Sequence, residues 1–209
     1  MSHGIRIYSF PLSGHAHRVE LFVSIANIKH EIVYVDLPSG EHKKEPFLTL
    51  NPLGQVPVIE DNDIVISDSN AILVYLARRY APDFLPSDPM LEAEVQKFLT
   101  LAAGEIAFGP AAARLITDFD APFDAQFCQI VAEKALTKLD TLLANKDFLV
   151  GGRPTIADIA VYSYVAHAPE GNVSLDKYPN VLRLLSNIEN LDGFKAMPRT
   201  AVGLSLIHI

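Results

Sequence analysis

The chain has 209 residues, 49% of them hydrophobic, and a formal net charge of −8 at pH 7. This length allows one or two compact domains, and the negative charge argues against nucleic acid or an anionic membrane as partner, since both need clustered Lys and Arg. A single cysteine excludes an internal disulfide. The start of the chain resembles no export signal, and no apolar run approaches the ~18 residues of a membrane helix, so we expect a soluble cytoplasmic protein.

The first 80 residues alternate between strand-like and helix-like stretches. Strand-like patterns occupy residues 5–10, 31–37, 56–61 and 63–67, the last two around a plausible tight turn at Asp61-Asn62. Helical spacing is found in residues 18–28 and 67–80, with a mixed stretch at 41–50. The order β-α-β-(α)-β-β-α predicts that the first two strands are parallel and that the last two form a hairpin.

Both helices predicted in this part have an apolar side. In the first, the residues expected to be buried are Val19, Phe22, Val23 and Ala26. In the second, which begins with capping residues, they are Ile72, Leu73, Leu76 and Tyr80.

Residues 81–89, APDFLPSDP, break this alternation and predict a linker between two domains. The rest is helical in pattern, with helices predicted over 90–117, 123–144, 155–168, 178–188 and 191–196. In the second of these helices, the predicted buried stripe is Phe127, Val131, Leu139 and Leu142. The expected fold class is therefore an α/β domain, residues 1–82, followed by an all-α domain, residues 90–209.

Three stretches, in the same order along the chain, resemble the glutathione transferases. PLSGHAHRV (11–19) is similar to the serine-type active-site loop of the phi and theta classes. GEHKKEPFLTLNPLGQVPVIEDNDIVISDSNAI (40–72) resembles the glutathione-binding region, and FLVGGRPTIADIAVY (148–162) a helix start in the second domain. The fold that this resemblance implies, a thioredoxin-like domain joined to a helical one, agrees with the element order above.

Ser13 is the candidate catalytic residue. It stands between a predicted strand and a predicted helix, where free backbone N–H groups and the helix dipole favour an anion. A thiol such as that of glutathione has a pKa near ~8.5, and a serine hydroxyl, too weak to act as its base, can donate a hydrogen bond to the thiolate. Taken alone, a serine at this place is more often only a helix cap, and the resemblance is what implies the catalytic role.

The resemblance also implies a set of glutathione-binding residues: His42, Lys43, Gln55, Val56, Pro57, Asp68 and Ser69. A cis bond before Pro57 would turn the Val56 backbone toward the peptide, which would then bind as an added strand. Asp68 would pair with the α-amino group and Ser69 would help bind a carboxylate at the helix start, with Ser67 as a possible cap. Without the resemblance these residues are a solvated charge run, a trans-proline at a strand edge and a plain helix cap.

Several polar residues have simpler interpretations. His15 and His17 are two apart and cannot form an i, i+4 metal pair, so we expect solvated helix-start histidines or contacts with the electrophile, and no metal site. Arg18 is expected to be structural. Thr155 and Asp158 predict a capping box without a part in the chemistry. Cys128 is predicted to be a small packed side chain.

The electrophile pocket is expected to draw on Phe10, Pro11, Leu12, Phe108 and Ala111. The apolar tail, residues 201–209, is expected to lie over the site or to pack on the core. The leading hypothesis is a detoxifying glutathione transferase that conjugates apolar electrophiles or reduces hydroperoxides, with glutathione as co-substrate and no other cofactor. A non-catalytic binding or regulatory protein of the same fold and a glutathione-dependent isomerase are the alternatives. The resemblance further implies a homodimer, with Phe47 as a possible apolar anchor.

Overall fold

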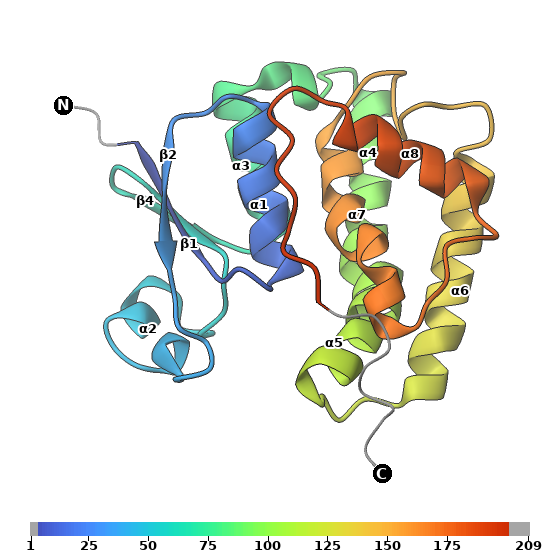
Figure 1. The fold of residues 1–209 in the computed structure, drawn as a ribbon. Coiled ribbons are helices and arrows are strands. Elements are labelled where there is room, and N and C mark those ends of the chain that lie inside the picture. The colour runs from blue at the N-terminus through green and yellow to red at the C-terminus, as the bar shows by residue number, and fades with distance from the viewer. Residues whose placement is uncertain (1–3, 201–209) are drawn as a thin grey trace, which may run out of the picture. The chain divides into compact units, whose positions relative to one another are not determined.

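The computed structural model describes residues 4–200, which form two compact units (Figure 1). Of the described residues, the first unit contains those up to Leu85 and Asp192–Met197, while the second contains Pro86–Leu191 and residues 198–200. The first unit is α/β and the second is helical. The predicted fold class is therefore confirmed.

A four-stranded sheet forms the centre of the first unit. Its strands, in spatial order, are β2 (His30–Tyr34), β1 (Ile5–Ser9), β3 (Val58–Asp61) and β4 (Ile64–Ser67). β1 pairs in parallel with β2, and β3 pairs antiparallel with both β1 and β4. Ile7 lies opposite Ile32 in one pair and opposite Ile59 in the other. The predicted parallel pair and hairpin are both confirmed.

The helices of this unit are α1 (Gly14–Ile25), η1 (Glu41–Lys43), α2 (Phe47–Leu50), α3 (Ser69–Tyr80) and η2 (Pro82–Phe84). α1 and α3 lie side by side on one face of the sheet (Figure 1). Their predicted apolar sides are buried apart from two residues. Ala26, the C-cap residue that follows α1, is half-buried. Tyr80 is 41% exposed, because its hydroxyl reaches Asp61 instead, and Ala77 completes the buried side of α3.

The helix predicted over residues 191–196 is wrong. This segment has no regular secondary structure and packs on α1. Gly193 has a φ of 78°, and a Cβ at this position would lie 2.5 Å from the Ser24 carbonyl oxygen. The segment therefore makes side-chain contacts with α1 in place of a helix: the Ser24 hydroxyl donates to Gly193 O (2.6 Å), and Lys195 Nζ donates to Glu20 (2.7 Å).

The second unit is built from helices. They are α4 (Pro89–Leu101), the π-helix η3 (Ala102–Ala111), α5 (Ala112–Phe119), α6 (Ala125–Leu142), α7 (Ile156–Ala166), η4 (Ala168–Gly171) and α8 (Pro179–Glu189). η3 packs closely on α6, and Gly109 is at the point of close approach. A Cβ at this position would lie only 2.6 Å from Ala132 N.

Residues Pro89–Phe119 form one continuous helical stretch of 31 residues. By length and composition alone it is apolar enough to cross a membrane, with a mean hydropathy of 1.3 in its most apolar window, contrary to the sequence-based expectation. Half of this window is buried inside the protein, against α6 and α7. Core helices of water-soluble proteins have the same composition, so this is weak evidence for a membrane span.

The predicted stripe on α6 is partly wrong. Phe127 is 57% exposed, Val131 and Leu142 are half-buried, and only Leu139 of the predicted stripe is buried. The other buried residues of α6 are Cys128, Ala132, Ala135 and Leu136. The small side chains of this set allow the close approach to η3, which the pattern of large apolar residues did not reveal. The prediction that Cys128 is a packed residue is confirmed.

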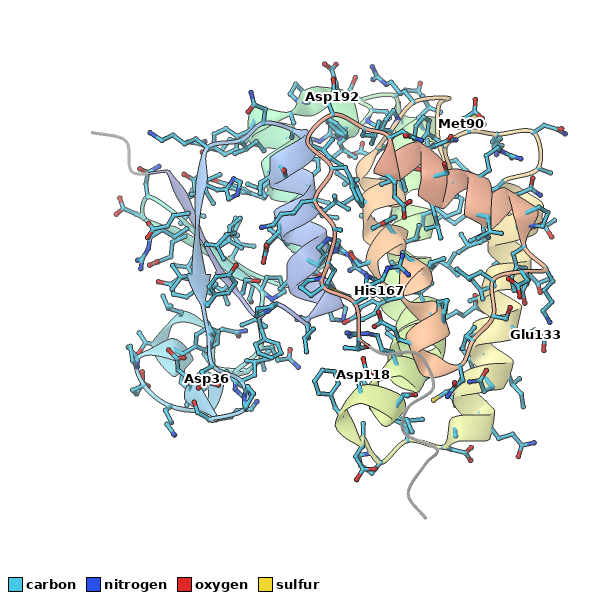
Figure 2. The ribbon with its side chains drawn as sticks, viewed as in Figure 1. Asp36, Met90, Asp118, Glu133, His167 and Asp192 are labelled. Carbon is cyan, nitrogen blue, oxygen red and sulfur yellow. The ribbon has the colours of Figure 1, made fainter. Side chains whose placement is uncertain are left out.

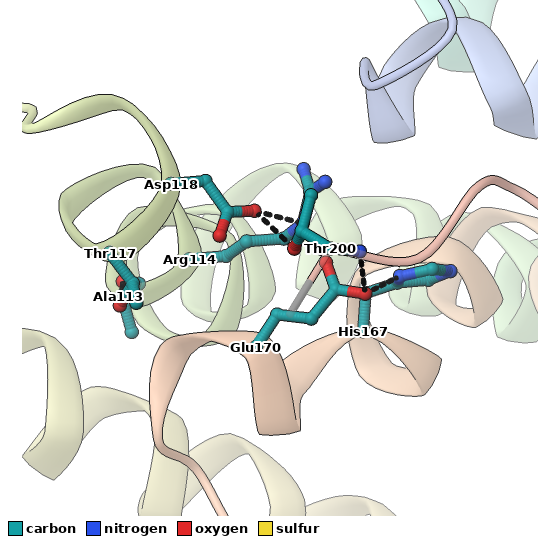
Figure 3. Close-up of polar contacts among 7 residues, drawn as sticks. All are labelled: Ala113, Arg114, Thr117, Asp118, His167, Glu170 and Thr200. Atoms are coloured by element: carbon teal, nitrogen blue, oxygen red, sulfur yellow. Dashed lines mark hydrogen bonds and ion pairs between the residues drawn. The ribbon is translucent and has the colours of Figure 1, made fainter. Parts of the chain in front are cut away.

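The helical unit contains a buried cluster of charged residues (Figure 3). Arg114 Nε donates to Glu170 Oε2 (2.5 Å) and lies 3.1 Å from Asp118 Oδ2, and the His167 ring donates to Glu170 Oε1 (2.7 Å). Thr200 donates to both carboxylates, through its hydroxyl to Asp118 and its backbone N–H to Glu170. We call these five residues the Arg114 cluster. Asp118 and His167 lie inside this unit, whereas Met90 and Glu133 point out from its surface (Figure 2).

The start of α7 is a capping box, as predicted. Asp158 Oδ2 accepts hydrogen bonds from the Thr155 backbone (2.8 Å) and hydroxyl (2.9 Å), and its other oxygen accepts from Leu149 N (2.8 Å). Both Thr155 and Asp158 are fully buried. The cap therefore also fixes the preceding loop and presents no polar group to solvent.

Candidate functional site

A cleft of about 440 Å³ opens in the first unit. It is lined by Ser13, His15, Leu37, His42, Lys43, Asn51, Leu53, Gly54, Gln55, Val56, Pro57, Ser67, Asp68 and Ser69. The candidate catalytic serine and all seven candidate glutathione-binding residues thus line one cleft. They come from the start of α1, from η1, from the loop before β3 and from the start of α3.

Ser13 is the N-cap of α1. Its Oγ accepts a hydrogen bond from Ala16 N (3.3 Å), and its carbonyl oxygen accepts from His17 N (2.8 Å). The side chain is half-buried. A hydroxyl oxygen that accepts a backbone N–H keeps its own proton for donation, so capping and donation to an anion are compatible.

His42, Lys43 and Gly54 form one wall of the cleft. Lys43 Nζ donates to the carbonyl oxygens of Leu53 (3.2 Å) and Gly54 (2.9 Å), which ties η1 to the loop before β3. Gly54 has a φ of 58°, and a Cβ there would lie 2.6 Å from His42 O, so only glycine fits. Burial, and next the charge of Lys43, lower the pKa of His42.

The Val56–Pro57 peptide bond is cis, as the resemblance implies, and so is Glu45–Pro46, which was not predicted. Val56 and Pro57 line the cleft, and within residues 4–200 no backbone hydrogen bond uses Val56. Its N–H and C=O can therefore pair with an extended ligand.

Asn51 also lines the cleft and was missed by the sequence analysis. It is buried, its amide nitrogen donates to Gln55 O (2.8 Å), and its Oδ1 accepts from Leu53 N (3.1 Å). The side chain thus closes the turn that carries Gln55 to the cleft. The signal was the Asn51-Pro52 pair, since asparagine before proline favours a turn.

The start of α3 differs in one respect from the prediction. Asp68, and not Ser67, is the N-cap: its Oδ1 accepts from Asn70 N and Ala71 N, both at 2.9 Å, while Ser67 ends β4. Asp68 has a φ of 72°, which non-glycine residues rarely adopt, and such backbone outliers concentrate at functional sites. Ser69 is the first residue of α3, so its N–H has no acceptor within the helix.

Both histidines lie in the first turn of α1, as expected, but neither is fully exposed to solvent. His15 is half-buried and lines the cleft, with Nδ1 3.2 Å from Ser69 Oγ. His17 is 4% exposed and donates from Nε2 to Lys195 O (2.8 Å), away from the cleft lining. Arg18 is buried as well, and its Nη1 donates to Ser69 Oγ (2.9 Å) and to Asn70 Oδ1 (2.8 Å). Arg18 therefore stabilises the cleft wall.

The candidate electrophile residues belong to different units. Phe10, Pro11 and Leu12 precede Ser13 in the first unit, with Pro11 exposed and the other two half-buried. In η3 of the second unit, Phe108 is 61% exposed and Ala111 is buried. The tail, residues 201–209, lies outside the described residues.

Phe47 cannot act as the proposed dimer anchor in this structure. It is 4% exposed and packs with Val35 and Val58, with its ring edge-to-face against Tyr8 at a centroid distance of 6.1 Å.

Among residues 4–200, no group of three or more His, Cys, Asp or Glu side chains could hold a metal ion. The lining of the cleft thus includes hydrogen-bond donors and the Lys43 ammonium group.

Comparison with known proteins gives consistent matches. The model of the glutathione S-transferase N-terminal domain matches residues 3–78, and that of the C-terminal domain matches residues 112–197. The chain is 34% identical over 169 residues to glutathione S-transferase APIC of Nicotiana tabacum, covering 74% of this chain and 78% of that protein. It is 30% identical over 196 residues to a probable maleylacetoacetate isomerase of Caenorhabditis elegans, covering 91% of each. A crystal structure of a glutathione S-transferase from Pseudomonas fluorescens superposes with a TM-score of 0.88 at 28% identity, covering 93% of this chain and 99% of that one.

Proposed function

The chain belongs to the glutathione S-transferase family, and from that premise we propose that it is a transferase that binds glutathione in the cleft and stabilises its thiolate with the Ser13 hydroxyl. The observation that carries this proposal is the convergence of Ser13 and the seven candidate glutathione-binding residues on one cleft. In this proposal, residues 1–82 form the glutathione-binding domain and residues 90–209 a domain that acts on the second substrate.

The peptide would bind as an added strand. Val56 would exchange backbone hydrogen bonds with the cysteinyl residue, and the exposed side chain of Gln55 would contact the peptide. The N–H and hydroxyl of Ser69 would bind the γ-glutamyl carboxylate, and Asp68 would pair with the neighbouring amino group. His42 and Lys43 would lie at the glycyl end, where the cation favours a carboxylate.

Ser13 would act on the thiol without taking its proton. The Ala16 N–H fixes the hydroxyl oxygen, and the remaining proton would be donated to the thiolate at the positive end of α1. Lowering the thiol pKa by about two units needs ~2.7 kcal/mol, which one charge-assisted hydrogen bond and the helix dipole can supply. The thiolate would then add to an apolar electrophile or displace its leaving group. With an organic hydroperoxide it would take the outer oxygen as a sulfenic acid and release the alcohol, and a second glutathione would convert the sulfenic acid to the disulfide and water. Both would be detoxification reactions.

A second candidate is a glutathione-dependent isomerase. The match to a probable maleylacetoacetate isomerase covers 91% of both chains, a larger share than the match to the tobacco transferase. An isomerase would use the same thiolate, but would add it to a double bond and then release it, so that glutathione is recovered.

We also propose a homodimer that works in the cytoplasm. The reducing glutathione pool of that compartment supplies the co-substrate and keeps the lone Cys128 reduced. Sedimentation of the chain at micromolar concentration should show a dimer, and a monomer would contradict this part of the proposal.

Calorimetry and two assays test the function. Glutathione should bind, and S-methylglutathione should bind too but without a titrating thiol. Conjugation of an aromatic halide supports the transferase, whereas recovery of free glutathione with isomerised cis-enone substrate supports the isomerase. Binding without turnover in either assay, across a panel of electrophiles and hydroperoxides, would favour a non-catalytic binding protein.

A further inference from the structure

His15 connects the two helix starts at the cleft. It is the second residue of α1, two positions after Ser13, and its Nδ1 lies 3.2 Å from the Oγ of Ser69, the first residue of α3. Ser69 is 4% exposed, so few other groups can compete for its hydroxyl. The direction in which this hydroxyl donates its proton therefore depends on which ring nitrogen of His15 carries a hydrogen.

The Ser69 hydroxyl has one proton and two lone pairs. Arg18 Nη1, 2.9 Å away, can only donate and so occupies one lone pair. The second lone pair and the proton are left for His15 and for a ligand in the cleft. If His15 donates to Ser69, the hydroxyl proton points to the ligand; if His15 accepts, the proton is used within the protein.

His15 has a single ring proton at neutral pH. Burial, and next the charge of Arg18, lower its pKa to about 4, while Asp68 acts weakly in the opposite direction. A neutral imidazole donates from one nitrogen and accepts at the other. The Ser69–His15 hydrogen bond thus has two discrete forms, and an anion in the cleft favours the form in which Ser69 donates to it.

We infer that in the ligand-bound protein His15 carries its proton on Nδ1 and donates it to Ser69, so that Arg18 and His15 together direct the Ser69 proton to the carboxylate of the bound peptide. His15 is then a positioning residue that acts through Ser69 on substrate affinity. This inference rests on the proposed glutathione function.

Three substitutions at His15 separate the two ring nitrogens. His15→Asn places an amide N–H near the position of Nδ1, His15→Gln reaches the position of Nε2, and His15→Leu removes both. His15→Leu and His15→Gln should weaken glutathione binding about tenfold, as the loss of one hydrogen bond to an anion predicts, while His15→Asn should stay within about threefold of the unaltered chain. The thiol of bound glutathione should titrate as in the unaltered chain in all three variants.

The ligand supplies a second test. γ-Aminobutyryl-cysteinyl-glycine is glutathione without the γ-glutamyl α-carboxylate. If His15 acts through Ser69 on that carboxylate, His15→Leu and the unaltered chain should bind this analogue equally. An equal loss of affinity for both ligands would overturn the inference and leave His15 with a role in folding of the cleft.

The tautomer can be observed directly. In protein labelled with ¹⁵N-histidine, the His15 ring shifts in the glutathione complex should show Nδ1 protonated, and protonation on Nε2 would overturn the inference. Undiminished glutathione binding by His15→Leu would overturn this inference alone. No glutathione binding by the unaltered chain would overturn it together with the proposed function.

Discussion

Two buried arginines, one in each unit, donate hydrogen bonds to different kinds of acceptor. Arg18 and Arg114 are each 1% exposed, and a histidine lies near each of them. Arg114 donates to carboxylates, whereas the hydrogen bonds of Arg18 to Ser69 and Asn70 reach neutral oxygen atoms at the lining of a cleft. Arg114 is thus paired with buried carboxylates, while Arg18 donates to the Ser69 hydroxyl, which belongs to a residue that lines the cleft.

The helix starts show the same difference. At the start of α7, both carboxylate oxygens of Asp158 accept hydrogen bonds from the protein, and the cap is fully buried. At the starts of α1 and α3, the caps Ser13 and Asp68 line the cleft and keep hydrogen-bonding capacity for a ligand. A buried charge or a capped helix therefore does not indicate a ligand site by itself. The distinguishing features are neutral hydrogen-bond partners for the buried charge and a cleft beside the cap.

The largest expected effect is on the Arg114 cluster. Arg114→Leu would leave Glu170 and Asp118 buried without their cation, and the free energy of unfolding should fall by about 3–5 kcal/mol. Urea unfolding measures this loss, and calorimetry on the remaining folded protein should give an unchanged glutathione affinity.

Two controls accompany this substitution. Lys177→Ala removes an exposed ion pair with Glu133 and should leave the unfolding midpoint unchanged. Arg114→Leu combined with Glu170→Leu should recover part of the lost stability, because the paired charge is removed as well. A change in glutathione affinity on Arg114→Leu would show that the Arg114 cluster influences the cleft. This would contradict the distinction drawn between the two arginines.

At the cleft, Ser13→Ala should act on chemistry more than on folding. Glutathione should still bind, but its thiol pKa in the complex should rise toward the free value, and turnover at neutral pH should fall about ten- to a thousandfold, since each ~1.4 kcal/mol is a factor of ten. Loss of the cap should cost about 0.5–2 kcal/mol of stability. The measurement is thiolate absorbance of bound glutathione against pH.

Ser13→Cys and His17→Ala are the companions of this variant. A cysteine at a helix N-terminus should form mixed disulfides with glutathione and should not restore conjugation. His17, whose ring donates to Lys195 O, should change turnover only a few-fold. A thiolate that titrates normally in Ser13→Ala would show that the serine is only a cap.

Much of the fold could be predicted from local pattern. The order of the elements along the first unit, the hairpin and the capping box follow from periodicity and from residue types that act on their immediate neighbours. The errors concern one missed turn signal and long-range contacts. Residues 191–196 contain Asp192-Gly193, which is typical of a turn, and the segment binds Ser24 and Glu20 of α1. Phe127 is exposed because α6 packs its small residues against η3.

At the site, the resemblance supplied the residues that lie on the cleft, but not their hydrogen bonds. The link between His15 and Ser69 joins residues 54 positions apart, and no short motif carries it. Asn51 likewise acts on a loop conformation that depends on Gly54. Residue types were therefore predictable here, whereas tautomers, proton directions and the true cap of α3 required the folded geometry.

Asp158, in the buried cap of α7, should make the free energy of unfolding depend on pH. Burial raises its pKa to about 6 against the hydrogen bonds that favour the carboxylate. Since the folded state then holds the proton more tightly than the unfolded state, stability should be highest below about pH 4 for this group and should fall as the pH rises to 6. The loss can reach ~2.7 kcal/mol for two pKa units. This slope, measured by urea unfolding, should disappear in Asp158→Asn; a slope of opposite sign would show that the hydrogen bonds outweigh burial.

The smallest expected effect concerns Lys195. Its ion pair with Glu20 is neither fully buried, as the Arg114 cluster is, nor part of the cleft lining. Its Nζ donates to Glu20 Oε2 (2.7 Å), but the lysine side chain is 43% exposed while that of Glu20 is 9% exposed, and Ser9 also donates to this carboxylate. Solvent screens such a pair, so Lys195→Ala should cost only about 0.5–1 kcal/mol, and Lys195→Arg should restore it. Lys29→Ala, on the same unit, serves as the matched control for loss of an exposed lysine. Because Glu20 lies on the helix that begins after Ser13, the thiolate titration should be repeated on Lys195→Ala, and we expect it to be unchanged. A loss of stability as large as that of Arg114→Leu would contradict this prediction. It would show that Glu20 is as isolated from solvent as Glu170.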